Sequence, residues 1–569
     1  MTSIKRFIPG IGAVRSYDRS WVSRDVVAGV VLTALLVPQG MAYAELAGLP
    51  AITGLYTSIM CLLGYAVFGP SRILVLGPDS SLGPMIAATI LPLVGADGDP
   101  AKAVALASML SLLVAVCMIG AGVGKLGFVA DLFSKPTQIG NMNGLALTIL
   151  VGQLPKLFGF SIDADTFVED LRGFVEGVVD GETVTAALAV GLGGLAIILG
   201  FARIAPKVPG VLVAVVAAIA VVVLLDLGSE GVSLVGDLPQ GFPPLTLPGV
   251  GLGDLSLLVA GALGITLVSL TDTISTSSAF AARTGQEVDA NQEMIGIGAA
   301  NLASGLFQGF PVSTSGSRTA VAEQSGAKSQ LTGVVGALMI AAMLLFVPGL
   351  FRNLPQPVLA SVVIAASLSL ADVPATVRLW KQRRMEFGVS MAAFAGVTAL
   401  GVLPGIAIAV AISILNVFRR MWRPYRAELG LVDGLEGYHD LTSHPEGETM
   451  DGLVVFRFDA PLVFANSRTF RDEVRGLAAS DPAPTWIVVA AEPITDVDTT
   501  AADMLEDLDE ELNAERVSLV FAEMKTPVQE KVQRYGLTRT IDPAHFFHTI
   551  DEAVAAFVAL HDTPPQEMS

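Results

Sequence analysis

Residues 255–278 read LSLLVAGALGITLVSLTDTISTSS, an apolar run that places one carboxylate, Asp272, ahead of a hydroxyl-rich end. Further along, residues 309–319 read GFPVSTSGSRT, a glycine- and serine-rich break between apolar runs. A carboxylate at membrane depth costs about 3 kcal/mol or more unless a cation, a proton or a partner compensates it. An intramembrane acid beside an interrupted helix is therefore predicted to form an ion or substrate site. These two stretches predict an ion-coupled membrane transporter.

Composition supports a membrane location for most of the chain. Of its 569 residues, 52% are hydrophobic and 15% are charged, and the mean hydropathy is +0.63. Charged residues are sparse from 26 to 418 and frequent afterwards, so a membrane region and an aqueous region are expected. We predict a cytosolic N-terminal segment (1–25), a transmembrane transport domain (26–426), a linker (427–451) and a C-terminal domain (452–569).

The sequence argues against a disulfide framework, a cysteine metal site and a signal peptide. Both cysteines, Cys61 and Cys117, lie inside apolar runs, so neither a disulfide framework nor a cysteine metal site is expected. The first 25 residues lack an apolar segment that ends in a small-residue cleavage site, so no signal peptide is expected. The net charge of −19 would argue against nucleic acid and anionic lipid as ligands if it were spread evenly, but much of the acid lies in the C-terminal domain and in the acidic loops. The charge therefore says little about the transported species.

Fourteen apolar runs are candidate membrane helices. They fall at about residues 26–48, 51–68, 78–95, 102–126, 127–155, 182–202, 208–226, 255–279, 294–308, 317–325, 329–347, 356–372, 385–402 and 404–420. The third and the tenth are short and interrupted by glycine or proline, and each is third in its set of seven. Short, broken segments at matching positions of two halves are typical of an inverted-repeat transporter, so we expect an α-helical polytopic protein with a 7+7 repeat.

The charges between these runs predict the orientation. Loops on the N-terminal side are basic, with Lys5, Arg6, Arg15, Arg19, Arg24, Arg72, Lys125, Arg203, Lys207, Arg283, Lys328, Arg378, Lys381, Arg383, Arg384, Arg419, Arg420, Arg423 and Arg426. The opposite loops carry Asp97, Asp99, Asp163, Asp165, Glu169, Asp170, Glu176, Asp180, Glu182, Asp226, Glu230 and Asp237. Because basic loops stay in the cytosol, both termini are expected there, with the protein in the cell membrane. Trp21, Trp380 and Trp422 fall at expected cytosolic helix ends, where interface anchors belong.

The pattern changes after Arg426. Strands are expected at 452–458, 485–491 and 517–523, and helices from about 467, at 499–514, around 527–535 and at 549–560. This alternation predicts a small α/β domain with a mostly parallel sheet. The domain has no histidine or cysteine cluster and no phosphate-binding glycine loop, so we do not expect an enzyme.

Two helix starts are candidates for an anion site. In LGPDSSLGPM (76–85), an extended stretch leads to glycine and proline and then to a helix, and FPVSTSGSRTA (310–320) repeats the design. The free N–H groups and the positive dipole end of a helix attract anions. If the repeats are inverted, the two starts face each other near the bilayer midplane and hold an anion with N–H and hydroxyl donors. The alternative is that both breaks are ordinary kinks of membrane helices.

Asp272 and Thr276 are candidates for a cation site. They lie four residues apart and so share one helix face, with Thr273 and Ser275 beside them. Carboxylate and hydroxyl oxygens suit a hard cation such as Na⁺, and a proton on Asp272 would neutralise it equally well. Alternatively, Asp272 is a polar residue that reaches cytosolic water.

Arg318 and Asp79 each have two interpretations. Arg318 is the main candidate for a fixed positive charge in the anion pocket, or it pairs with an acid such as Glu323 or Asp79. Asp79 would compete with an anion for the helix dipole, so we expect it to cap the helix start rather than to take part in coupling.

Three stretches carry a family resemblance. VPQGMAYAELAGLPAITGLYTS (37–58), FGPSRILVLGPDSS (68–81) and STSGSRTAVAEQSGAKSQLTG (313–333) resemble the sulfate permease (SulP) family, which includes prestin and bacterial bicarbonate transporters. The C-terminal part resembles a STAS domain. The resemblance implies a core and a gate domain, elevator-like movement, a homodimer and a cytosolic partner at the STAS domain.

The resemblance also assigns residues. It implies an anion site at Gln39, Tyr43, Asp79, Ser80, Ser315, Gly316, Ser317 and Arg318. The sodium site of bicarbonate-transporting members corresponds to Asp272, Thr276 and the backbone at Thr314, Ser315 and Gly316. Asp79 replaces an aromatic residue of prestin-like members, and Gly316 replaces a threonine of the bicarbonate transporters. Asp498 and Thr499 occupy the loop that carries a phosphorylated serine in anti-sigma-factor antagonists, although a plain helix cap is the expected role here.

The expected function is secondary active transport of a small inorganic oxyanion, with sulfate first, coupled to Na⁺ or H⁺ through Asp272 and with no other cofactor. A Na⁺-coupled bicarbonate or dicarboxylate symporter and an uncoupled anion exchanger or channel are the alternatives. A nucleobase carrier of the same fold is a third hypothesis, against which the STAS domain counts.

Overall fold

The computed structural model describes residues 9–95, 98–127, 134–162, 164, 166–205, 208–284 and 288–561. Six charged residues of the orientation argument lie outside them: Lys5, Arg6, Asp97, Asp163, Asp165 and Lys207. The chain divides into two compact units, Met1–Ser413 and Ile414–Ser569.

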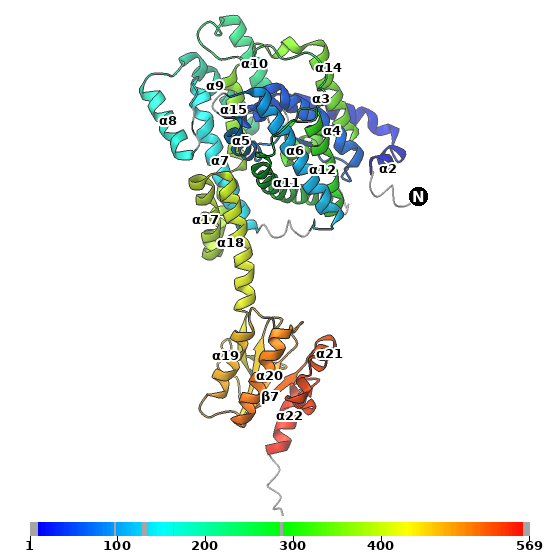
Figure 1. Ribbon diagram of the computed structural model, residues 1–569, viewed down its shortest axis with the longest axis vertical. Helices are drawn as coiled ribbons and strands as arrows, with labels where there is room; N and C mark the ends of the chain where they lie inside the picture. Colours follow the sequence, from blue (N-terminus) through cyan, green and yellow to red (C-terminus); the bar gives the residue numbers. More distant parts are fainter. Residues whose placement is uncertain are drawn as a thin grey trace, which may run out of the picture. The chain divides into compact units, whose positions relative to one another are not determined.

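The first unit is helical (Figure 1). Its α-helices are α2 (Pro9–Arg15), α3 (Val22–Leu46), α4 (Ala51–Phe68), α5 (Gly83–Val94), α6 (Pro100–Val123), α7 (Lys135–Phe158), α8 (Phe167–Val179), α9 (Thr185–Ile204), α10 (Gly210–Leu225), α11 (Leu255–Thr284), α12 (Ala290–Leu306), α13 (Gly316–Gln324), α14 (Leu331–Phe346), α15 (Gln356–Leu370), α16 (Val373–Gln382) and α17 (Arg384–Leu400). Helix α18 (Val402–Trp422) begins in this unit and ends in the second.

Each of the fourteen apolar runs overlaps one of these helices, while α2, α8 and α16 lie outside the runs. Within the described part of the chain, seven helical stretches are long and apolar enough to cross a membrane, and three apolar helices are shorter. A polytopic helical fold is therefore confirmed. The number of spans and the 7+7 repeat stay predictions.

The helices of the first unit pack in two groups. In one, α12 packs on α4 and α6, α14 on α3 and α4, and α11 on α5 and α6. In the other, α7 packs on α15 and α17, and α9 on α10 and α15. Glycines permit the closest approaches, since a Cβ at Gly54 would lie 1.9 Å from the Gly40 carbonyl oxygen on α3. The same holds in the second group, where a Cβ at Gly140 of α7 would lie 1.9 Å from the Ser390 carbonyl oxygen on α17.

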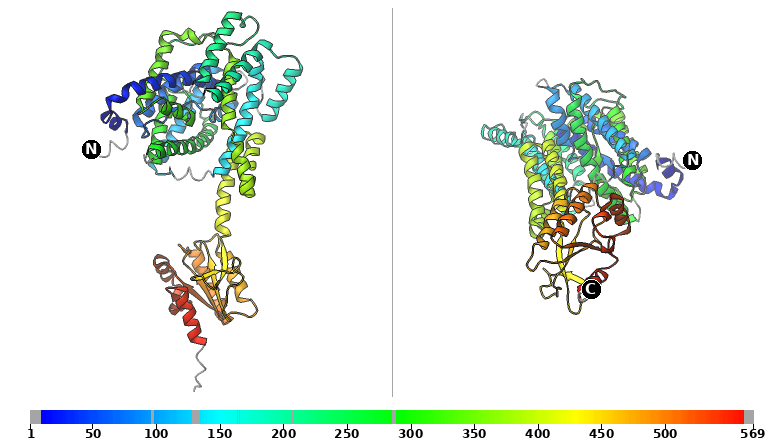
Figure 2. Two further views of the ribbon diagram at one scale, coloured as in Figure 1. Left: turned by 180° about the vertical axis from the view of Figure 1, so that it is seen from behind. Right: turned by 60° about the horizontal axis from the view of Figure 1, so that its bottom comes forward.

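The second unit is an α/β domain (Figure 2). Its sheet has the order β4-β3-β5-β6-β7-β8, with β5 to β8 parallel and β3 antiparallel to both of its neighbours. The strands are β3 (Arg426–Leu431), β4 (Tyr438–Asp440), β5 (Leu453–Phe458), β6 (Trp486–Ala490), β7 (Ser518–Ala522) and β8 (Phe546–Phe547). Helices α19 (Ser467–Ala478), α20 (Thr499–Ala514) and α21 (Thr526–Tyr535) supply one hydrophobic core, and α22 (Ile550–His561) supplies another.

The expected linker 427–451 holds two strands of this sheet, β3 and β4. β3 pairs with β5 from Arg426 opposite Phe458 to Leu429 opposite Val455. Charged residues on its exposed side, such as Glu428, interrupt the apolar pattern from which strands were predicted. β3 lies between β4 and β5, and its only buried apolar side chains are Ala427 and Leu429, which explains why its sequence resembles a linker.

Candidate functional site

The two glycine-containing breaks lie side by side. Residues Leu76–Gly77 form β1 and Ser313–Thr314 form β2, and the two pair antiparallel, with Leu76 opposite Thr314. The Ser315 amide donates to the Val75 carbonyl oxygen at 3.0 Å, which extends the pairing by one bond. A short helix follows each strand, α5 after β1 and α13 after β2. The structure thus brings both predicted helix starts into one region.

A buried asparagine on α12 holds β2 in place. Asn301 accepts a hydrogen bond from the Val312 amide through Oδ1 at 3.0 Å and donates through Nδ2 to the Val312 carbonyl oxygen at 3.3 Å. Its own helix supplies a further partner, the Ile297 carbonyl oxygen at 3.0 Å. Since unpaired backbone groups are costly in the membrane interior, these bonds explain how the extended segment is tolerated there.

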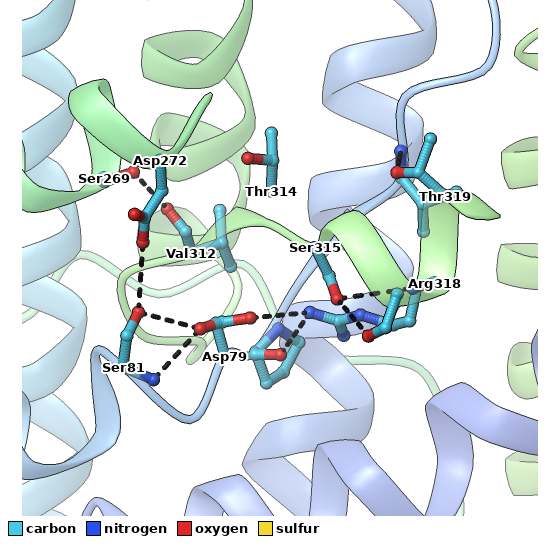
Figure 3. A network of polar contacts seen from close by, with 12 residues as sticks. Asp79, Ser81, Ser269, Asp272, Val312, Thr314, Ser315, Arg318 and Thr319 are labelled. Atoms are coloured by element: carbon cyan, nitrogen blue, oxygen red, sulfur yellow. Dashed lines mark hydrogen bonds and ion pairs between the residues drawn. The ribbon is translucent and has the colours of Figure 1, made fainter. Parts of the chain in front are cut away.

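Arg318, in the first turn of α13, has a buried guanidinium that is 1% exposed. Its Nη2 donates to the Pro78 carbonyl oxygen at 2.7 Å and lies 3.5 Å from Asp79 Oδ2 (Figure 3). Its Nε and Nη1 have no hydrogen-bond partner among the described residues. A Cβ at Gly77 would lie 2.6 Å from Nη1, so only glycine leaves the guanidinium this position. The site therefore contains a buried cation with unused donors.

Of the two acids suggested as partners of Arg318, the structure selects Asp79. Glu323 instead pairs with Arg283 of α11, with Nη1 and Oε2 3.1 Å apart. Asp79 also accepts hydrogen bonds through Oδ1 from the Ser81 amide at 3.0 Å and the Ser81 hydroxyl at 2.8 Å. These contacts close the turn before α5, where the amides of Leu82 and Gly83 donate to the Asp79 carbonyl oxygen. Asp79 thus both closes the helix start and neutralises part of the Arg318 charge.

Asp272 lies on α11 and faces this turn (Figure 3). Its Oδ2 is 3.4 Å from the Ser81 hydroxyl, and its Oδ1 is 3.5 Å from Gln138 Nε2 on α7. Both distances are long for hydrogen bonds, and no cationic side chain of the described chain forms an ion pair with Asp272. Gln138 belongs to the second helix group, so this contact joins the two groups at the site.

The residues of the expected cation site lie together between α11 and α13. The Thr314 hydroxyl donates to the Thr273 hydroxyl at 3.2 Å. A Cβ at Gly316 would meet only Thr276, with both Cγ2 and Oγ1 at 3.9 Å, so Thr276 lies next to the start of α13. The hydroxyls of Thr273 and Thr276 therefore lie beside Thr314 and Gly316, on the same helix as Asp272. No group of three or more histidine, cysteine or acidic residues that would suit a transition metal occurs within the described ranges.

The remaining residues of the expected anion site come from α3, from the turn between β1 and α5, and from the start of α13. Tyr43 and Ser80 are both buried, with the Ser80 hydroxyl close to the Tyr43 phenol. Gln39 lies one turn before Tyr43 on α3 and is partly buried. Ser315 caps α13 by accepting from the Arg318 amide at 3.4 Å, and its hydroxyl lies 3.1 Å from that of Ser317.

Sequence reasoning missed two contributors to this region: Ser81 joins the two carboxyls, and Gln138 approaches Asp272 from α7. It named Thr273 and Gly77 without the contacts they make, which are a hydrogen bond with Thr314 and room for the Arg318 guanidinium. Ser81 stands beside the predicted Ser80, so the motif contained its signal. Nothing in the local sequence indicates Gln138, because only the packing of α7 brings it near.

Comparison with known proteins shows where the chain belongs. Residues 22–393 match the model of the sulfate permease family, and residues 444–553 match that of the STAS domain. The chain is 39% identical over 550 residues to the probable sulfate transporter Rv1739c of Mycobacterium tuberculosis, covering 96% of this chain and 98% of that one. It is 30% identical over 565 residues to the probable sulfate transporter 3.3 of Arabidopsis thaliana, covering 95% and 89%.

Solved structures support the same fold. The structure of SLC26A9 superposes with a TM-score of 0.90 at 23% identity, covering 99% of this chain and 94% of that chain. The transmembrane domain of the cyanobacterial bicarbonate transporter BicA gives a TM-score of 0.62 at 23% identity, covering 69% of this chain and 98% of that chain. At these identities the likeness concerns the fold alone. The comparison confirms a helical transmembrane domain followed by a STAS domain.

Proposed function

The chain belongs to the sulfate permease family, and from this membership and the site we propose that it transports a small inorganic oxyanion, with sulfate as the first candidate. The anion binds between β1, β2 and the starts of α5 and α13. The observation that carries the proposal is the buried guanidinium of Arg318, which has two unused nitrogen donors. Charge-assisted hydrogen bonds from guanidinium to an oxyanion are among the stronger polar contacts in proteins.

Two relatives that span almost the whole chain are named probable sulfate transporters. Both alignments include the membrane unit and the C-terminal unit, so the similarity to these transporters is not confined to one domain. Sulfate is tetrahedral and carries two charges, so it suits hydroxyls, helix-start N–H groups and a guanidinium that converge from different elements. A Na⁺-coupled bicarbonate or dicarboxylate symporter remains the alternative, and substrate competition separates the two.

The charge balance of the site supports coupling to a cation. Each helix start contributes roughly half a positive charge, so two starts give about +1. Arg318 and Asp79 cancel each other as an ion pair, and Asp272 cancels the remaining charge. A dianion is therefore attracted only after a cation or a proton neutralises Asp272. We propose this neutralisation as the coupling step.

The hydrogen bonds around Ser81 allow a proton to neutralise Asp272. The Ser81 hydroxyl has one proton, and the shorter of its two carboxylate contacts, 2.8 Å to Asp79, is the one to which it donates. Its oxygen can then accept a hydrogen bond from a protonated Asp272 at the 3.4 Å contact. For Na⁺, the candidate oxygen ligands are the Asp272 carboxylate and the hydroxyls of Thr276 and Thr314. The uptake experiment therefore tests a Na⁺ gradient and a pH gradient separately.

An elevator-like movement of the first helix group against the second is proposed as the transport step. The first group contributes α3, α5, α11 and α13, and the second approaches the site through Gln138 of α7. We further propose cytosolic termini in the cell membrane, a homodimer, and a cytosolic partner at the STAS domain. Asp498 caps α20 there by accepting from the Ala501 amide at 2.8 Å, and Thr499 is the first residue of that helix.

The function is tested by uptake of radiolabelled sulfate into proteoliposomes with an imposed Na⁺ or pH gradient. A coupled transporter accumulates sulfate above equilibrium with one of these gradients. An exchanger needs an internal anion and responds to neither gradient. Unlabelled bicarbonate, a dicarboxylate, uracil and xanthine serve as competitors, and competition by uracil or xanthine but not by unlabelled sulfate would contradict the proposal.

A further inference from the structure

The connection between α15 and α17 is an amphipathic helix, α16 (Val373–Gln382), that the sequence led us to treat as a loop. It starts at Asp372, whose side chain accepts a hydrogen bond from the Ala375 amide at 2.9 Å. Its inner face presents Ala375 and Leu379, which are buried against Ile139 of α7 and Phe387 of α17. These contacts fix which face of α16 points away from the protein.

The outer face of α16 is apolar. Val373, Val377 and Trp380 are 62%, 45% and 52% exposed. They are spaced four and three residues apart, so they form one stripe along the helix. Three large apolar side chains in a stripe are costly to leave in water. Since α15 and α17 are the apolar helices on either side, the stripe lies where a membrane surface begins.

Cations surround this stripe. Arg378, Lys381, Arg383 and Arg384 are all exposed. The Arg384 guanidinium lies 5.5 Å from the centre of the Trp380 ring, and Arg383 pairs with Glu386 at 3.2 Å. Arg378 and Lys381 have no ion pair within the ranges that the structure describes. The helix thus combines an apolar stripe, an aromatic anchor and a net positive charge.

We propose that α16 lies in the plane of the membrane interface and binds the headgroups of anionic phospholipids. A helix with a basic polar face and Trp or Leu on the apolar face adopts this position, and each Lys or Arg near an anionic surface contributes about 1 kcal/mol of attraction. A tryptophan ring at headgroup depth is the expected anchor. The occupant is a lipid rather than a protein because both the charge and the apolar stripe match a bilayer surface.

The helix is attached rigidly to the part of α7 that reaches the site. Asn143 of α7 accepts from the Asp372 amide at 2.7 Å and donates to the Thr376 hydroxyl at 2.8 Å. Ile139, against which α16 packs, is the neighbour of Gln138, and Gln138 contacts Asp272. A lipid bound to α16 would therefore restrict the movement of α7 at Gln138, the residue that contacts Asp272. This consequence for transport rests on the proposed function, whereas lipid binding does not.

Lipid binding is tested on the full-length protein by native mass spectrometry with phosphatidylglycerol and phosphatidylcholine. The test variant is Arg378→Gln/Lys381→Gln/Arg384→Gln. The control variant Arg468→Gln/Arg516→Gln/Arg534→Gln removes three exposed cations from the C-terminal unit. We expect the wild type and the control to retain phosphatidylglycerol preferentially, and the test variant to bind it about tenfold more weakly. Equal phosphatidylglycerol binding by all three proteins would overturn the proposal.

The depth of α16 in the bilayer is tested separately. This second test does not depend on correct folding of the triple variant. A protein with Trp380 as the sole tryptophan is prepared through Trp21→Phe, Trp422→Phe and Trp486→Phe. Lipids brominated near the headgroup should quench its fluorescence more than lipids brominated at the chain end. Absence of quenching by any brominated lipid places Trp380 in water and overturns the proposal. A disulfide between copies through Val377→Cys, formed in high yield, would show a second chain as the occupant and overturn it equally.

The transport arm compares sulfate uptake in phosphatidylcholine vesicles with and without phosphatidylglycerol. The wild type and the control should transport several-fold faster with the anionic lipid, whereas the test variant should lose this stimulation. If no variant transports sulfate while the lipid results hold, the proposed function fails and the lipid site stands. If transport is gradient-coupled but indifferent to anionic lipid, the link from α16 to Gln138 is wrong.

Discussion

At the scale of single residues, the site depends on a buried guanidinium and the glycine beside it. Arg318 contacts only the Pro78 carbonyl oxygen and Asp79, which leaves Nε and Nη1 unused within the described chain. Burial of unused donors is costly, and a bound anion would remove that cost. Sequence reasoning identified Arg318 as either a pocket charge or an ion-pair partner. The structure shows the pairing with Asp79, which occupies one nitrogen and leaves two that a bound anion could use.

Arg318→Gln should weaken sulfate binding about tenfold or more and bicarbonate binding less, because a Coulomb interaction scales with the charge of the ligand. Binding is measured by thermal shift or calorimetry with each anion. Arg283→Gln is the matched control, since it removes an exposed arginine that pairs with Glu323 on the same helix α13. Equal losses for the two anions, or none, would make Arg318 a purely structural partner of Asp79.

Gly77→Ala should reduce sulfate affinity about tenfold, whereas Gly316→Ala should change it little. A Cβ at Gly77 would lie 2.6 Å from Arg318 Nη1, so the guanidinium must move away from its position. A Cβ at Gly316 would approach nothing closer than 3.9 Å. The two variants therefore compare a glycine whose Cβ would displace the guanidinium with one whose Cβ would not. An unaffected Gly77→Ala protein would show that the position of the guanidinium does not matter for binding.

Asp272→Asn should leave the protein folded and abolish the dependence of sulfate uptake on Na⁺ and pH gradients. The amide keeps the shape of the side chain but has no charge to neutralise. Asp254→Asn, just before the same helix, is the control. Uptake is measured in proteoliposomes with each gradient in turn. Unchanged gradient dependence in the Asp272 variant would remove it from the coupling step.

At the scale of helices and strands, local pattern predicted most elements and failed where tertiary contacts decide. Apolar runs predicted the helices α3 to α7, α9 to α15, α17 and α18, because each has a strong local signal. The pairing of β1 with β2 joins residues more than two hundred positions apart, as Leu76 and Thr314 show, and no local signal encodes it. Amphipathic α16 and charged β3 were missed because their hydrophobic content is low and their partners are distant.

Helix α20 carries a pH-sensitive residue that gives an element-scale prediction. Asp509 is buried on its inner face, and burial raises the pKa of its carboxyl to about 6. Because the folded pKa exceeds the usual value, this group's contribution to stability is full below about pH 4 and is lost as the pH rises through about 6. We compare the free energy of unfolding of Asp509→Asn with that of the wild type at each pH. This difference should be more favourable to the variant at about pH 7 than at about pH 4, by about 1 to 2 kcal/mol.

This is measured by urea unfolding of residues 424–561, a unit with its own hydrophobic cores. Comparing the variant with the wild type at each pH removes the opposite contributions of Asp440 and Asp496, whose pKa values are lowered by hydrogen bonds from Tyr425 and Lys531 respectively. The neighbouring Asn513 donates to Asp509 Oδ2 at 3.0 Å, a bond that asparagine can also accept. A stability difference that is equal at the two pH values would contradict the assignment.

At the scale of the whole molecule, every residue of the candidate site lies in the first unit. A chain that ends after Arg423 should therefore keep its sulfate affinity within about twofold, while transport or assembly falls. The cut must fall before β3, because a cut at residue 452 would leave β3 without its partner β5. Calorimetry on the purified, folded truncation checks this. Complete loss of binding would place part of the anion site in the second unit.

The central claim is that an oxyanion binds between β1, β2 and Arg318. It is tested most directly by determining the structure with selenate, a sulfate analogue whose selenium is located by anomalous scattering. We expect one selenium peak near the starts of α5 and α13, with a selenate oxygen about 3 Å from Arg318 Nε or Nη1. A selenium peak at full occupancy elsewhere, with none beside Arg318, would show that the oxyanion does not bind between β1, β2 and Arg318.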